Sequence, residues 1–74
     1  MRAGENERMD IQLNGETRPF PSPLTLAGLL AAEGLAERRV AVEVNGEIVP
    51  RGRHGDWQLN AGDVVEIVHA LGGG

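Results

Sequence analysis

The stretch that decides the fold is MDIQLNG, residues 9–15. Its apolar side chains, Met9, Ile11 and Leu13, alternate with polar ones, which is the pattern of a strand with one buried face. The NG dipeptide that closes the stretch is the strongest short signal for a hairpin turn, because both positions tolerate positive φ. Residues 16–20 are therefore expected to form the returning strand of a hairpin.

The apolar spacing changes after this hairpin, and residues 24–34 follow a helical period. Three prolines, which have no N–H for a sheet hydrogen bond, are expected to end the returning strand: Pro19, Pro21 and Pro23. The helix then presents a stripe of three leucines: Leu26, Leu29 and Leu30. Thr25 is the expected N-cap, and Gly34 suits the left-handed position after the helix. Gly28 costs the helix about 1 kcal/mol of stability relative to alanine.

The rest of the chain has the patterns of strands and turns. Apolar and polar residues alternate, and a second NG dipeptide marks a second hairpin. In order, the sequence predicts a strand over residues 40–44, a turn at 45–46, a strand over 47–49 that Pro50 ends, a loop over 51–56, a brief strand at Trp57 and Leu59, and a long strand over 64–70.

These elements make one α+β domain. A single amphipathic helix buries its apolar stripe by packing on one face of a mixed sheet. The first and last strands are both strongly apolar, so we expect them side by side at the sheet centre. The predicted fold is a ubiquitin-like β-grasp, with a mixed sheet of four to five strands and one main helix. Residues 9–71 form the domain, residues 1–8 a disordered N-terminal extension, and residues 72–74 a flexible glycine tail.

Composition narrows the functional classes. The 74 residues include one Phe, one Trp and no cysteine, and the formal net charge is -4. An acidic chain repels phosphate backbones, so nucleic-acid binding is disfavoured, and no apolar run approaches the roughly 20 residues that span a membrane. The lack of cysteine fits a cytoplasmic protein. The negative charge either keeps the domain in solution or steers it to a basic protein surface.

Residues that could catalyse a reaction are few. His54 and His69 stand far apart, and without cysteine the sequence suggests no set of metal ligands. Ser22, the single serine, lies between two prolines and lacks the strand-to-helix turn of a hydrolase nucleophile. The domain is therefore expected to be a binding module or a carrier and not an enzyme, with no metal and no bound cofactor.

The run GGG, residues 72–74, follows a strong strand and one apolar residue, Leu71. It is either a tail without a role, such as a cloning remnant, or a functional stem. Glycine has no Cβ, so a glycine stem can pass through a channel that would exclude side chains. Three extended residues reach about 10 Å, which is enough to present a terminal carboxylate to a partner's active site.

Four stretches in order resemble the thiamine-biosynthesis sulfur carrier family, called ThiS. They are MDIQLNG at 9–15, VNGEIVPR at 44–51, GDVVEIV at 62–68 and GGG at 72–74. Each stretch alone is weakly specific, whereas the ordered set with this spacing is a strong match. The resemblance runs from Met9 to Gly74, and Gly28 departs from the acidic residue common at its position.

The resemblance implies a protein co-substrate whose reactive group is the carboxylate of Gly74. A ThiF-like adenylating enzyme would activate this carboxylate with ATP, and a persulfide derived from cysteine would convert it to a thiocarboxylate. Thiazole synthase would then take the sulfur to build the thiazole of thiamine. Leu71, Gly72 and Gly73 would lie in the partner's channel, and the free carrier would be a monomer.

Two alternatives stay open. The first is a molybdopterin-type carrier, or a carrier of another pathway, with the same fold and tail. The second is a non-catalytic ubiquitin-like interaction domain, which has no need of a terminal glycine run.

A docking surface is predicted on the last strand. If Val65 and Ile67 face the helix, then Val64, Glu66 and Val68 share the opposite face. An apolar patch on so small a sheet is a candidate contact for the adenylating enzyme. Otherwise these valines are ordinary exposed aliphatics of a small domain.

Overall fold

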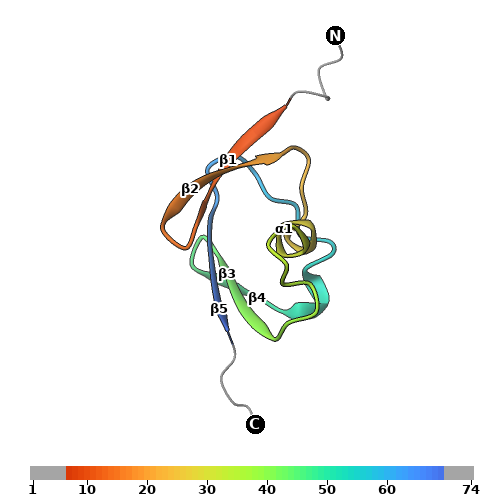
Figure 1. Cartoon of the computed structure of the whole chain (residues 1–74). Helices are drawn as coiled ribbons and strands as arrows, with labels where there is room; N and C mark the ends of the chain where they lie inside the picture. Colours follow the sequence, from red (N-terminus) through yellow and green to blue (C-terminus); the bar gives the residue numbers. More distant parts are fainter. Residues whose placement is uncertain (1–6, 70–74) are drawn as a thin grey trace.

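The computed structural model describes residues 7–69 of the chain. Figure 1 shows a curved sheet with a single helix lying across one side of it. The elements, in chain order, are β1 (Arg8–Leu13), β2 (Glu16–Pro21), α1 (Leu26–Ala32), β3 (Val40–Val44), β4 (Glu47–Val49), the 3-10 turn η2 (Arg51–Arg53) and β5 (Val64–His69).

The sheet has five strands in the order β2-β1-β5-β3-β4. Its centre is the parallel pair β1 and β5, with Gln12 beside Val64 and Leu13 beside Val65. β2 pairs with β1, and β3 pairs with both β4 and β5, all antiparallel. The predicted β-grasp arrangement is therefore confirmed, including the central position of the first and last strands.

The core lies between α1 and the sheet. The three leucines of the predicted stripe are buried, and Thr25 is the N-cap as expected, because its hydroxyl accepts the N–H of Gly28 at 3.0 Å. Gly34 has φ of 76°, which confirms the left-handed position after the helix. The largest fully buried side chains come from both layers: Ile11, Leu26, Leu29, Val42 and Val65.

The structure corrects the predicted limits of the first hairpin. Pro19 and Pro21 lie inside β2 and do not end it. β2 is an edge strand, and the N–H of Ser22 donates to the carbonyl of Glu7 at 3.3 Å. Because backbone nitrogens alternate in direction along a strand, those of Pro21 and Pro19 face away from β1. Their missing N–H groups therefore cost the sheet no hydrogen bond. Arg8 belongs to β1 and pairs with Pro21 of β2. The prediction that residues 1–8 form a disordered extension is therefore wrong at Arg8. The residues before Glu7 lie outside the described part.

The predicted brief strand at Trp57 and Leu59 is also wrong. Within this described segment there is one isolated antiparallel β-bridge, between Gln58 and Thr25. Backbone hydrogen bonds of 2.9 Å join Trp57 to Leu26 and Leu59 to Leu24, so the segment runs beside the start of α1. Both side chains pack on the core, so their alternation reflects packing at the helix end and not pairing in the sheet.

The predicted loop over residues 51–56 contains the turn η2. α1 is 7 residues long, and none of the helices found within residues 7–69 is long and apolar enough to cross a membrane.

Candidate functional site

The predicted reactive end of the chain lies outside the described residues. This applies to Gly74, to the stem residues Leu71, Gly72 and Gly73, and to the last residue of the predicted strand, Ala70. What the structure describes is the strand that leads to them, β5, which ends at His69. The geometry of the candidate site is therefore the geometry of β5 and its surroundings.

Asn14 holds one side of β5. The N–H of Asn14 donates to the carbonyl of Val65 at 2.9 Å, and its side-chain Oδ1 accepts the N–H of Ile67 at 2.8 Å. β1 pairs with β5 only as far as Leu13, so the amide of Asn14 continues the pairing by one further rung. The side chain of a turn residue thus supports the outer half of β5.

Asn45, the first residue of the second NG dipeptide, holds the start of β5. Its N–H donates to the carbonyl of Val64 at 2.7 Å, and its Oδ1 accepts the N–H of Val64 at 2.9 Å. Its Nδ2 donates to Asp63 at 3.0 Å, and the other carboxylate oxygen of Asp63 accepts the N–H of Asn60 at 2.8 Å. These bonds fix the turn from which β5 begins.

The sequence predicts Asn14 and Asn45 as turn formers, and their roles in positioning β5 were not predicted. Both have positive φ, 50° and 53°, as the NG turns require. The available signal was chemical: asparagine at a turn carries an amide that bonds to nearby backbone. The partner strand, 53 residues away for Asn14, could not be identified from that signal.

The two faces of β5 are arranged as predicted. Val65 is fully buried and Ile67 is 8% exposed, whereas Val64 and Val68 are 37% and 62% exposed on the opposite face with Glu66. This places the predicted docking residues on the side of the sheet away from α1. Their role in docking stays a prediction.

The open face extends across β3 to β4. Ala41 lies opposite Val68, and Glu43 lies between Glu66 and Ile48. Ile48 is 60% exposed, so apolar side chains flank a pair of carboxylates on neighbouring strands. Like charges directly opposite in a sheet repel each other, and a cationic partner group would relieve that repulsion.

The two histidines take different positions. His54 is buried, and its Nε2 lies 3.1 Å from the carbonyl oxygen of Val49. His69 is exposed at the end of β5. Within residues 7–69 no three His, Asp or Glu side chains are grouped so that they could hold a metal ion.

A mixed five-stranded sheet in this order, with one helix across one face, defines the protein as a small ubiquitin-like β-grasp domain. The model of the ThiS family matches residues 11–74, which is most of the chain. The chain belongs to the ThiS family.

Individual relatives agree with this assignment. The sulfur carrier protein ThiS of Bacillus subtilis (strain 168) is 40% identical over 65 residues, which cover 86% of this chain and 98% of that protein. The crystal structure of the thiamine biosynthesis protein ThiS from Geobacter metallireducens superposes with a TM-score of 0.77 at 32% identity, covering 89% of this chain and 100% of that chain. The predicted family and fold are thus confirmed.

Some relatives are much longer. A thiazole synthase of Paramagnetospirillum magneticum (strain ATCC 700264 / AMB-1) is 44% identical over 66 residues, which cover 89% of this chain. The chain spans about a fifth of the length of the thiazole synthases that it matches. The similarity to these enzymes therefore concerns one segment of each of them.

Proposed function

We propose that this chain carries sulfur as a thiocarboxylate on Gly74 and donates it for thiazole formation in thiamine biosynthesis. The observation that carries the proposal is the family match, which extends through residue 74 and so includes the glycine run. The near full-length similarity to a sulfur carrier protein supports it further. In this role the chain is a co-substrate, and the catalytic residues belong to its partners.

The activation step consumes ATP on a ThiF-like adenylating enzyme. An oxygen of the Gly74 carboxylate attacks the α-phosphorus of ATP, which forms an acyl adenylate and releases pyrophosphate. The terminal sulfur of a partner's persulfide, supplied from cysteine, then attacks the acyl carbon and displaces AMP. A second partner thiol attacks the resulting acyl disulfide at the partner's sulfur, which releases the thiocarboxylate and leaves a disulfide on the partner.

The open face of β5 is the proposed docking surface for the adenylating enzyme. Its exposed valines and the paired carboxylates Glu43 and Glu66 suit a partner surface with apolar and basic groups. Leu71, Gly72 and Gly73 then lie in the partner's channel, since glycine passes where side chains would clash.

Thiazole synthase is the proposed acceptor of the sulfur. The similarity of this chain to a segment of thiazole synthases favours this acceptor over a molybdopterin-type pathway. The chain itself binds no cofactor, acts as a monomer when free, and works in the cytoplasm, where its ATP-dependent partner would act.

The test is sulfur loading in vitro. The protein is incubated with the cognate ThiF-like enzyme, ATP and the persulfide donor, and its intact mass is measured. We expect replacement of one oxygen by sulfur, located in the tryptic peptide 54–74, because no Lys or Arg follows Arg53. Adding thiazole synthase and its substrates then returns the mass to that of the carboxylate.

Two altered chains make the test specific for Gly74. Deletion of Gly73 and Gly74 abolishes loading, and so does one residue added after Gly74, because both displace the activated carboxylate. Deletion of Met1 and Arg2 is the matched control and leaves loading unchanged. Normal loading of either C-terminal variant would refute the proposal.

A further inference from the structure

A half-open cavity of about 200 Å³ lies on the helix side of the domain, away from the open face. It separates α1 from the chain that follows η2. Its lining combines apolar side chains of α1 and the following turn with two nitrogen-bearing side chains of the η2 region: Ala27, Leu30, Ala36, Arg51, His54 and Gly55.

The chain around His54 is firmly held. Its N–H donates to the carbonyl of Arg51 at 3.1 Å, and its own carbonyl accepts the N–H of Ala27 at 3.0 Å. The side chain is 8% exposed, so this wall of the cavity is anchored both to η2 and to the start of α1. The cavity is therefore part of the packed domain and not a gap beside a loose loop.

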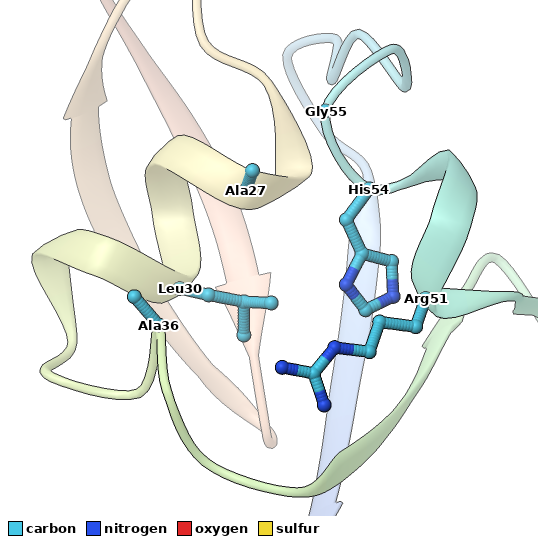
Figure 2. Close-up of a pocket in the computed structure, with 6 residues that line it drawn as sticks. All are labelled: Ala27, Leu30, Ala36, Arg51, His54 and Gly55. Carbon is cyan, nitrogen blue, oxygen red and sulfur yellow. The ribbon is translucent and has the colours of Figure 1, made fainter.

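His54 turns a polar atom into the cavity. A carbonyl oxygen only accepts hydrogen bonds, so the contact of Nε2 with the carbonyl of Val49 requires the proton on Nε2. The other ring nitrogen, Nδ1, faces α1 and Leu30 in Figure 2 and has no hydrogen-bond partner among residues 7–69. Among the described residues no side-chain N or O atom is both buried and without a hydrogen-bond partner, so Nδ1 lies at the accessible surface of the cavity, where a ligand can reach it.

Arg51 points into the same space. In Figure 2 its guanidinium extends toward Leu30 and Ala36, below the ring of His54. Among the described residues no carboxylate forms an ion pair with it; the ion pair found there joins Arg18 and Glu33. Two nitrogen groups thus converge on one cavity whose remaining wall is aliphatic.

We propose that this cavity binds a short aliphatic carboxylate. The guanidinium of Arg51 matches the two oxygens of a carboxylate, and the ring of His54 forms the adjacent wall of the cavity. The side chains of Ala27, Leu30 and Ala36 take the aliphatic part. The carboxylate comes either from a free acid or from a glutamate side chain of a partner protein, and the two share one chemistry.

A titration of the full chain with sodium butyrate, followed by NMR, tests the proposal. Sodium chloride at equal ionic strength is the reference. We expect saturable shifts in the millimolar range at Ala27, Leu30 and His54, as suits a ligand of about six heavy atoms. Arg51→Gln should weaken the apparent affinity by about tenfold or more, because the charge-assisted hydrogen bonds of the guanidinium are lost. Arg53→Gln removes the same charge outside the cavity lining and leaves the affinity unchanged.

A second variant keeps the test independent of charge. Ala36 is exposed at the cavity rim, so Ala36→Leu narrows the cavity without removing a core contact and should abolish the shifts. A blocked Gly-Glu-Gly peptide in place of butyrate identifies the source: equal binding of the peptide indicates a partner's glutamate, and binding of butyrate alone indicates a free acid. Absence of saturable shifts with both ligands, or equal affinity in Arg51→Gln, would overturn the proposal.

Discussion

Asn14 combines a turn with a strand contact in one side chain. Its φ of 50° is the positive φ that the hairpin turn requires. Its amide oxygen accepts the N–H of Ile67, beyond the point where the pairing of β1 with β5 ends. On its β1 side, the outer half of β5 thus depends on one side-chain hydrogen bond. The strand that leads to the predicted reactive end of the chain is held at this residue.

Two substitutions separate these roles. Asn14→Gly keeps the positive φ but removes the acceptor, so the Ile67 amide should exchange with solvent about fivefold faster, as expected for one hydrogen bond of about 1 kcal/mol. Asn14→Asp keeps an oxygen acceptor and should restore the slow exchange. Amide exchange by NMR measures both, with the β3 amides as internal reference. Equal protection of Ile67 in both variants would mean that the side chain does not hold the strand.

α1 is too short to be stable alone. Helices of fewer than about 12 residues are marginal in water, and this one has 7. Its stability therefore comes from its buried leucines and from the cap at Thr25. Gly28 sits against that cap: an added Cβ would lie 3.1 Å from Leu24 Cδ1 and 3.3 Å from Thr25 Oγ1. The usual gain from replacing a helical glycine by alanine is thus reduced here by crowding.

Removal of the cap tests this dependence. Thr25→Ala leaves the N–H of Gly28 without its acceptor and should lower the free energy of unfolding by about 1 kcal/mol. Thr25→Ser keeps the hydroxyl and should stay close to the wild type. Urea denaturation gives both values, and a Thr25→Ala protein as stable as the wild type would show that the leucines alone hold the helix.

The elements show what sequence patterns predict and what they miss. The strands were predictable because Met9, Ile11 and Leu13 alternate in and out of one core, and α1 because its leucines repeat at helical spacing. Pro19 inside β2 was not predictable, since its tolerance depends on β2 being at the sheet edge. The packing of Trp57 beside α1 depends likewise on tertiary contacts, which local periodicity does not contain.

The candidate site was predictable only in part. The alternation along β5 correctly assigned Val68 to the open face, because period two fixes which side chains share a face. The cavity at His54 was not predicted, since its walls come from α1 and η2, which are distant in sequence. The sequence places His54 in a predicted polar loop, which gives no signal of burial. The burial of His54 arises only from the packing of that loop on the helix.

The domain as a whole has two dissimilar sides. α1 covers one side of the sheet, and the other presents Val68, Ile48 and the carboxylates of Glu43 and Glu66. The proposed docking surface and the core therefore lie on opposite sides of the same five strands. A change on the open side should affect association without disturbing the core.

Val68→Asp tests this separation. Val68 is 62% exposed, so the fold should be kept, while a third acidic group beside Glu43 and Glu66 should weaken binding to the ThiF-like enzyme by about tenfold or more. Gln58→Glu adds one negative charge beside α1 and is the matched control. Calorimetric titration gives the affinities and circular dichroism the fold. Unchanged affinity of a folded Val68→Asp protein would exclude β5 from the interface.

The parallel pairing of β1 and β5 has a mechanical consequence. Because the two strands point the same way, β1 begins at Arg8 on one end of the sheet and β5 ends at His69 on the other. Tension applied between these two points pulls the central strands past each other in shear. The backbone bonds from Gln12 and Asn14, together with the amide of Asn14 to Ile67, then bear the load simultaneously and are not peeled apart one after another. The domain should therefore resist stretching along the line that joins Arg8 to His69.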